Sequence, residues 1–338
     1  MTLVAIAQAL GVSKATVSLV LNGKAKSQHI SDDTIHAVLS YARANNYQPN
    51  FHAVRIRRKI VNCVMLLLNT QDRYNDINSF SDYNVAMITG GIASEARRSN
   101  YSLLVRLFVP GKEEEMIYNS FRNHEIDGML YYGVTLPKAW TEVIQRENFK
   151  VVCLGASPQS GVSTININHR EMSRLLTEKL LKAGCRRFLF FAGFAESFPA
   201  RERYEGFLEA LREHHVPWQE NSIVEANFDE ATAYRCMLRY CQDNAELPDG
   251  VVCANDSMAL GVLRALKENG VQVPAQVRVT GGDNIAVSAY CSPSLTTFDN
   301  MTETMGVEAF RMLNRMINGQ DGNRHVVLKS KILKREST

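Results

Sequence analysis

The sequence contains no apolar run that approaches the roughly 18 to 20 residues required for a membrane-spanning helix. Its N-terminus also lacks the charged, apolar and small-residue zones of a secretion signal. Catalytic signatures are missing as well: there is no G-x-S-x-G elbow, no H-E-x-x-H, no P-loop, no dinucleotide fingerprint and no pair of carboxylates beside a credible nucleophile. We therefore expect a cytoplasmic protein that is not an enzyme and needs no cofactor.

The chain also lacks a C-x-x-C pair, although it contains seven cysteines. Most of these cysteines lie in apolar, strand-like runs such as VVCLG and VVCAN. Because free cysteine is among the most frequently buried residue types, we expect buried thiols rather than a metal or redox site.

Basic residues are plentiful, but they are unevenly distributed. The net charge is +3, yet residues 1–60 carry eight lysines and arginines against two aspartates, so the remainder of the chain is slightly acidic. A basic end on such a body is typical of nucleic-acid-binding proteins, because attraction to phosphates supplies much of their affinity. A merely solvated basic surface would produce the same pattern.

Two short periodic segments, residues 3–10 and 14–21, predict a helix-turn-helix at the N-terminus. Gly11 tolerates the turn conformation, and Val17 can fill the space between the two helices. A third helix with one apolar face is predicted over residues 32–45. The first part of the chain is therefore expected to be an all-α head.

Serines precede the second and third of these helices and are suitable N-caps, namely Ser13 and Ser31. With Ser13 as the cap, Lys14, Ala15 and Ser18 lie near the exposed N-terminal face of the second helix. Side chains at this place reach base edges when such a helix lies in the major groove.

From residue 60 onward, apolar strands alternate with amphipathic helices, which predicts parallel, doubly wound sheets covered by helices on both faces. Seven strands are expected, within residues 61–68, 102–108, 128–133, 150–155, 187–193, 249–255 and 277–282. Helices are expected between them, for example over 86–100 and 170–184. Ligands of such folds bind beyond the carboxyl ends of the strands, so the residues that follow each strand are the candidate site.

The sequence resembles the lactose/galactose repressor family of bacterial transcriptional regulators from end to end. The resemblance is carried by five segments: GVSKATVSLVLNG (11–23), NYQPN (46–50), VVCANDSMALG (251–261), VTGGDN (279–284) and SPSLTT (292–297). The stretch between Asn22 and Ser31 is longer than in the lactose repressor and is similar to the fructose and sucrose repressor branch. The family implies a helix-turn-helix head over 1–48, a hinge helix over 49–59 and an effector-binding and dimerisation domain over 60–338.

The resemblance implies specific contacts with double-stranded operator DNA. Lys14 and Ala15 occupy the main base-reading positions, and Leu19 replaces an arginine that many relatives carry. Contacts with phosphates or neighbouring bases are implied for Ser13, Thr16, Ser18 and Asn22.

The segment after the head corresponds to the family's hinge helix, which pairs with its twin and enters the minor groove. Ile56 occupies the position of the apolar wedge, where leucine is usual in relatives. Contacts with DNA are implied for Asn50, Ala53, Arg55, Ile56 and Arg57, with Arg58 and Lys59 holding further phosphates. Without the family, the same residues would be interpreted as a flexible basic linker.

The family also implies two lobes similar to a periplasmic sugar-binding protein, with an effector held between them. The first lobe is expected over about 60–167 and 298–323, and the second over about 168–297 and 324–338. Effector contacts are expected from residues at strand ends and helix starts, namely Tyr83, Tyr132, Arg203, Phe228, Asn255 and Asp283. Each has an alternative interpretation: Arg203 as a surface residue, Phe228 as core, or Asp256 instead of Asn255 as the working polar group.

Two departures from the family affect the expected ligand. Gly155 and Ala156 stand where many members have an Asp-Arg pair, so one common ligand anchor is missing. The stretch 69–84 is longer than usual, and Asp82, Tyr83 or Asn84 can compensate.

The resemblance implies a homodimeric repressor of carbohydrate-utilisation genes, with a sugar or sugar derivative as inducer. A purine or another metabolite acting as corepressor is the alternative that the sequence leaves open. A transport-type sugar-binding protein would have an export signal and no DNA-reading head, which is the reverse of this chain. A last strand is expected within HVVLKSKILKRES (325–337), and no heptad tail follows it, so we expect a dimer rather than a tetramer.

Overall fold

The computed structural model describes residues 2–21, 25–45, 47, 61–69, 82–133, 136–158, 162–218, 222–244, 246–320 and 324–338. The chain divides into two compact units, Met1–Val61 and Asn62–Thr338. The first is the helical head and the second is the α/β body.

The described residues of the head form three α-helices that match the predicted ones closely: α1 (Leu3–Leu10), α2 (Lys14–Leu21) and α3 (Asp32–Ala44), with a short 3-10 turn, η1 (Lys26–Gln28), before the third. Gly11 ends α1 with a φ of +62°, a conformation that favours glycine. Apolar side chains from all three helices form one small core, in which Ile6, Val17 and Val38 are fully buried. A separate core indicates that the head packs on its own residues.

Both predicted serine caps are confirmed. The Ser13 hydroxyl accepts a hydrogen bond from the backbone N–H of Thr16 at 3.0 Å, and that of Ser31 accepts one from Thr34 at 3.4 Å. These bonds satisfy backbone donors that have no partner inside a helix, which fixes where α2 and α3 begin.

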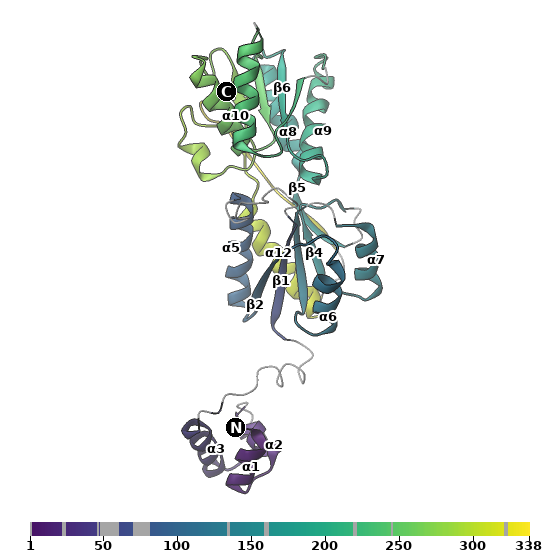
Figure 1. Cartoon of the computed structure of the whole chain (residues 1–338), viewed down its shortest axis with the longest axis vertical. Helices are drawn as coiled ribbons and strands as arrows, with labels where there is room; N and C mark the ends of the chain where they lie inside the picture. The colour runs from purple at the N-terminus through teal and green to yellow at the C-terminus, as the bar shows by residue number, and fades with distance from the viewer. Residues whose placement is uncertain are drawn as a thin grey trace. The chain divides into compact units, whose positions relative to one another are not determined.

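The first lobe of the body is built on a six-stranded parallel sheet with the strand order β11-β5-β4-β3-β1-β2. Its strands are β1 (Cys63–Asn69), β2 (Ser102–Leu107), β3 (Gly128–Gly133), β4 (Val151–Leu154), β5 (Ser163–Ile167) and β11 (His325–Leu328). Figure 1 shows α5 and α7 flanking this sheet. The helical elements of the lobe are α5 (Tyr83–Arg98), the π-helical turn η4 (Glu114–Asn119), α6 (Ser120–Arg122), α7 (Lys138–Arg146) and α12 (Thr302–Ile317).

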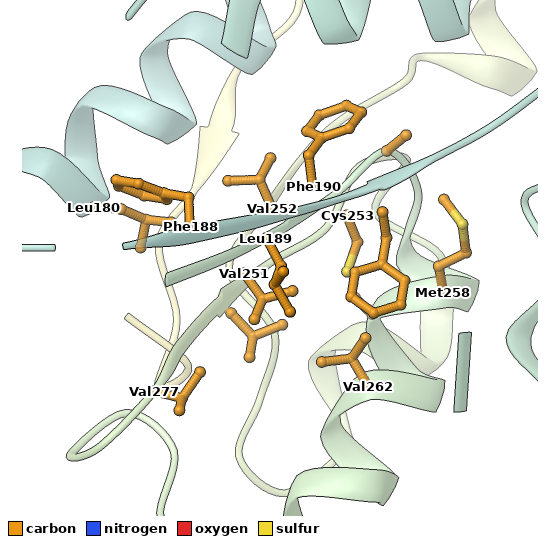
Figure 2. Close-up of a cluster of buried hydrophobic side chains, with 14 of the residues drawn as sticks. Leu180, Phe188, Leu189, Phe190, Val251, Val252, Cys253, Met258, Val262 and Val277 are labelled. Carbon is orange, nitrogen blue, oxygen red and sulfur yellow. The ribbon is translucent and has the colours of Figure 1, made fainter. Parts of the chain in front are cut away.

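The second lobe is built on a four-stranded parallel sheet with the order β7-β6-β8-β9. Its strands are β6 (Phe188–Ala192), β7 (Ile223–Glu225), β8 (Gly250–Cys253) and β9 (Arg278–Thr280), and its helices are α8 (His169–Lys182), α9 (Phe198–Glu213), α10 (Glu230–Asp243), α11 (Asp256–Glu268) and the 3-10 turn η7 (Ala286–Ala289). Figure 2 shows apolar side chains of β6, β8 and α11 in the core of this lobe. All seven predicted strands are present, and β5, β7 and β11 are among the further strands.

Three segments connect the lobes, and one of them differs from the prediction. The chain crosses after β5 and again at β10 (Thr297–Phe298), which pairs antiparallel with β12 (Ile332–Leu333). The placement of residues 324–338 in the second lobe is wrong for β11, because His325 to Leu328 pair in parallel with β5 at the edge of the first sheet. The third crossing therefore follows Leu328 and does not lie near residue 323.

The described residues contain no single helix that is long and apolar enough to span a membrane; α1 and α2 pass such a test only as a pair, bent by 111°. All seven cysteines are free thiols. Four are buried as expected, and three are only half-buried: Cys236, Cys241 and Cys291.

Helices α5 and α12 pack so closely that glycine is required at their contact. A Cβ atom at Gly91 would overlap the carbonyl oxygen of Glu303, and one at Gly306 would overlap that of Ile88. The neighbouring Gly90 faces open space. The two adjacent glycines of α5 thus have different surroundings.

We predict opposite effects of alanine at these two positions. Gly91→Ala should lower the free energy of unfolding by about 1–3 kcal/mol, because the helices must move apart. Gly90→Ala should raise it by up to about 1 kcal/mol, because alanine favours the helix and meets no neighbour. Urea unfolding followed by circular dichroism measures both, and equal effects would contradict the close packing.

Candidate functional site

The carboxyl ends of the strands in both lobes border a small cavity of about 70 Å³. This volume is well below the several hundred Å³ of typical ligand pockets, so the lobes are closed on each other. The enclosed space has room for only a few water molecules. The polar residues of the lining are Asn69, Asp82, Asn84, Tyr132, His169, Ser197, Arg203, Asn255, Asp283 and Asn300.

A buried ion pair between Arg203 of α9 and Asp283, which follows β9, lies at the centre of this lining. Arg203 Nη2 donates to Asp283 Oδ1 at 2.9 Å, and the two side chains are only 4% and 3% exposed. Removing one partner of such a pair leaves an uncompensated buried charge, which costs about 3–5 kcal/mol. The pair therefore holds the second-lobe wall of the cavity in place.

The remaining donors of Arg203 are almost fully used by other protein atoms. Nη1 donates to the carbonyl of Ala254, Nη2 also donates to Asn300 Oδ1 at 3.3 Å, and Nε donates to His169 Nδ1 at 3.4 Å. The guanidinium also lies over the Phe298 ring, 4.8 Å from its centroid. In this closed arrangement, Arg203 organises the site.

Asn84 connects this pair to the first lobe. Its Nδ2 donates to Asp283 Oδ2 at 3.0 Å, and its Oδ1 accepts from Thr302 Oγ1 at 3.0 Å and from Asn300 Nδ2 at 3.4 Å. Asp82 places Asn84 in the first turn of α5, because its carboxylate caps that helix by accepting from the backbone N–H of Asn84 at 2.8 Å. One amide thus bridges the two lobes.

Asn255 and Phe228 form another part of the wall. Asn255 is the N-cap of α11: its Oδ1 accepts from the N–H of Met258 at 2.9 Å, and its Nδ2 donates to the carbonyl of Phe228 at 3.3 Å. Phe228 has a φ of +62°, and a Cβ atom at Gly193 would overlap its ring. The tip of the ring therefore lies against Gly193, and the side chain both packs on the core and lines the cavity.

Asp256 lies behind this wall and is fully buried. Its carboxylate accepts from Thr297 Oγ1 at 2.6 Å and from the N–H of Ile285 at 2.9 Å. Burial, followed by the nearby Asp283 carboxylate, raises the pKa of Asp256 to about 7. Burial also raises the pKa of Asp283, although Arg203 opposes this shift. Asp256 thus anchors the segment that crosses between the lobes.

The structure brings together five of the six predicted effector residues around the cavity: Tyr132, Arg203, Phe228, Asn255 and Asp283. Tyr83 is not among the described lining residues, whereas its neighbours Asp82 and Asn84 are. Successive side chains of a helix point in different directions, so the neighbours of Tyr83 line the cavity and Tyr83 does not. Burial raises the pKa of Tyr83, and nearby carboxylates raise it further, with Asp299 having the largest effect among them.

Four polar lining residues were missed: Asn69, His169, Ser197 and Asn300. Asn69 is the last residue of β1, so the rule that ligands bind beyond strand ends applied to it. His169 follows β5, a strand that was not predicted. Asn300 lies in a crossing segment, and only tertiary structure places it near Arg203.

The head presents a second candidate site at the start of α2. Ser13, Lys14 and Ala15 are exposed, and Thr16, Ser18 and Leu19 are half-buried on the same helix. The Ser13 hydroxyl also lies 2.9 Å from Thr16 Oγ1. The serine that caps α2 and the Thr16 hydroxyl thus form one pair of polar groups at the start of the helix. The predicted contacts Asn22, Asn50, Ala53, Arg55, Ile56 and Arg57 lie outside the described residues. In the part of the chain that the structure describes, no group of three or more His, Cys, Asp or Glu side chains is placed to hold a metal ion.

Comparisons with known proteins agree with both parts of the chain. The family model for bacterial regulatory proteins of the lacI family matches residues 2–50, and that for a periplasmic binding protein-like domain matches residues 177–338. The HTH-type transcriptional repressor PurR of Haemophilus influenzae (strain PittEE) is 27% identical over 320 residues, which cover 94% of this chain and 91% of that protein.

Solved structures are similar over the whole length. A Lac repressor dimer bound to operator and the anti-inducer ONPF has a TM-score of 0.84 at 23% identity and covers 100% of this chain and 98% of its own. This likeness shows the fold. A complex of the transcriptional regulator CelR with cellobiose has a TM-score of 0.73 at 27% identity, and the match covers 100% of both chains.

We predict that the buried carboxyl of Asp256 makes stability fall as pH rises. An acid whose folded-state pKa is raised stabilises the fold below its unfolded pKa of about 4, and this contribution is lost as pH approaches 7. Relative to wild type, Asp256→Asn should therefore gain up to about 1.4 kcal/mol of unfolding free energy per pH unit over this range. The amide can keep both bonds, with its oxygen on Ile285 N–H and its nitrogen on Thr297.

Urea unfolding of both proteins between about pH 4 and pH 8 measures the difference. Taking the difference cancels the other titrating groups, which include His169. A difference that stays constant with pH would contradict the raised pKa.

Proposed function

Because the chain belongs to the lacI family of bacterial regulatory proteins, we propose that it is a transcriptional repressor whose binding to operator DNA is controlled by a small molecule held between the lobes. The observation that carries this proposal is the exposed N-terminal turn of α2 on a folded helix-turn-helix head. Lys14 and Ala15 stand at the place from which such a helix contacts base edges in the major groove.

The proposed DNA contacts divide into two kinds. Lys14 and Ala15 read bases, and the hydroxyls of Ser13 and Thr16 position the helix on phosphates. Ser18 and Asn22 contact phosphates or neighbouring bases. In the hinge, Asn50, Ala53, Arg55 and Arg57 contact DNA beside the wedge Ile56, which enters the minor groove. This division makes different predictions for sequence preference and for salt dependence.

The effector that we propose is a sugar or sugar derivative that acts as an inducer. Four asparagines and two aspartates line the cavity, and amide and carboxylate groups suit the alternating donors and acceptors of sugar hydroxyls. The Phe228 ring supplies an apolar face. The named ligand of the CelR complex, cellobiose, agrees with this class.

The alternative is a purine that acts as a corepressor, which the name of the Haemophilus relative favours. The two hypotheses predict opposite effects of the ligand on operator affinity: an inducer binds better to the state that releases DNA, and a corepressor to the state that holds it. The Phe228 ring and the charged pair of Arg203 and Asp283 also suit a flat heterocycle. Operator affinity with and without each ligand separates the two.

We also propose that the chain acts as a homodimer, because a roughly palindromic operator requires two recognition helices about one duplex turn apart. Large apolar side chains are exposed on the second lobe at η7, where Tyr290 is 87% and Val287 is 46% exposed. Exposed apolar clusters of this kind mark contact surfaces.

The head is tested by replacing its base-reading lysine. Lys14→Ala should bind a duplex selected by the wild type from a random pool about tenfold or more weakly, but should bind random duplex almost as well, because base contacts carry specificity. Fluorescence anisotropy over a range of salt concentrations measures both affinities.

Lys112→Ala removes the same charge from an exposed turn of the body and serves as the control. It should leave both affinities unchanged. The proposal fails if the wild type shows no preference for any duplex. The role of Lys14 is refuted if its replacement weakens binding to the selected and the random duplex equally.

Light scattering tests the dimer. We expect the mass of two chains for the wild type and a shift toward one chain for Tyr290→Asp, because a carboxylate would be buried in the contact. Val327→Asp, at an exposed position of edge strand β11, should keep the wild-type mass. A tetrameric mass would contradict the proposed assembly.

A further inference from the structure

His169 is a buried side chain of the cavity that no expected contact used. It is the first residue of α8, directly after Asn168, which caps that helix by accepting from the N–H of Glu171 at 3.1 Å. The side chain lines the cavity, and the residue is only 3% exposed. Its Nε2 is fully buried and has no hydrogen-bond partner among the described residues.

The bond from Arg203 determines which nitrogen of His169 carries the proton. A guanidinium N–H can only donate, so Nδ1 of His169 accepts from Arg203 Nε through its lone pair. Burial, followed by the adjacent charge of Arg203, holds the pKa of His169 well below its usual value, so the ring is neutral. In a neutral imidazole the other nitrogen carries the hydrogen, and Nε2–H is therefore a donor.

A buried donor without an acceptor is costly, at about 1–3 kcal/mol. Native proteins retain few such groups, and each requires an explanation. If His169 had only a structural role, its bond with Arg203 through Nδ1 would be sufficient, because its side chain makes no other hydrogen bond to the described residues. Because the residue lines the cavity, its unused Nε2–H points to a ligand atom as its acceptor.

We propose that His169 is a specificity-determining residue that donates a hydrogen bond through Nε2–H to an uncharged acceptor, a hydroxyl or carbonyl oxygen, of the effector. This inference rests on the proposed effector site. Arg203 then acts as a positioning residue that holds the imidazole in the required tautomer.

The charges around the cavity favour an uncharged acceptor over a phosphate or carboxylate. Arg203 is neutralised by Asp283, and Asp82 adds a further negative charge to the lining. The N-terminus of α8 contributes a positive end equivalent to only about half a charge, which attracts an acceptor oxygen but does not balance the remaining carboxylate of Asp82. An anion would also have to draw Arg203 away from Asp283.

The first experiment tests the tautomer in the full chain. Nitrogen-15 NMR of histidine-labelled wild type, with His169→Phe to assign the signal, should show the Nε2–H form of His169 at neutral pH. The Nδ1–H form, or a doubly protonated ring, would overturn the proposal regardless of the effector.

The second experiment tests the contact by thermal shift. The probes are D-glucose, cellobiose, hypoxanthine and guanine, with glucose 6-phosphate and inosine 5′-monophosphate as phosphorylated counterparts. At least one neutral probe should raise the melting temperature of the wild type. His169→Phe should weaken its binding roughly tenfold, the loss of one buried hydrogen bond.

Two further variants separate a polar contact from a structural role. His325→Phe replaces a histidine whose Nδ1 is also hydrogen-bonded, to Thr164 Oγ1 at 2.9 Å, but which does not line the cavity, and it should bind like wild type. His169→Gln, whose carbonyl can accept from Arg203 and whose amide can donate, should recover part of the affinity lost in His169→Phe.

Equal binding by wild type and His169→Phe would overturn the contact, and tighter binding of the phosphorylated probes would overturn the uncharged acceptor. A panel in which no probe binds would overturn the assigned ligand chemistry. Selective DNA binding by the same wild-type sample would then leave the proposed repressor function standing, so the two failures are distinguishable.

Discussion

The body depends on the buried ion pair between Arg203 and Asp283. Because both charges are almost fully removed from water, each must have its partner, and this requirement fixes the relative positions of α9 and the end of β9. Asn84 then extends the same network to the first lobe by a single amide. The closed cleft is thus held by polar groups that a sugar or a nucleobase could also bind, so a ligand competes with contacts that the protein makes with itself.

This competition gives a physical basis for control. A ligand can shift the equilibrium between closed and open lobes only by its difference in affinity for the two states. A coupling of about 1–3 kcal/mol is typical, and the bond of Asn84 to the Asp283 carboxylate across the cleft is of that order. The lobes are connected through three crossing segments, and Asp256, behind the cavity wall, is bonded to Thr297 in one of them.

The cavity lining illustrates where sequence reasoning succeeds and where it stops. Arg203, Asn255 and Asp283 were predicted from the resemblance to the lactose/galactose repressor family, and the structure brings them to one cavity. Asn69 obeys the rule that ligands bind beyond strand ends and was overlooked. His169 and Asn300 could not be found in this way, because their importance arises from one contact each with Arg203, and the three residues are far apart in the sequence. The prediction assigned β11 to the wrong lobe for a similar reason, because its pairing with β5 at the edge of the sheet is a long-range contact.

The sequence by itself determined the local structure: the three helices of the head with their serine caps, the seven strands it predicted, and the division into a basic head and an α/β body. These follow from hydrophobic periodicity and from side chains that bond to their own neighbouring backbone, both of which are local properties. Only the tertiary structure decided that Arg203 is committed to Asp283, that Asn84 rather than Tyr83 lines the cleft, and that His169 has a donor without an acceptor. Those results depend on burial, which removes water as the alternative partner and leaves the choice of partner to the packing of distant segments.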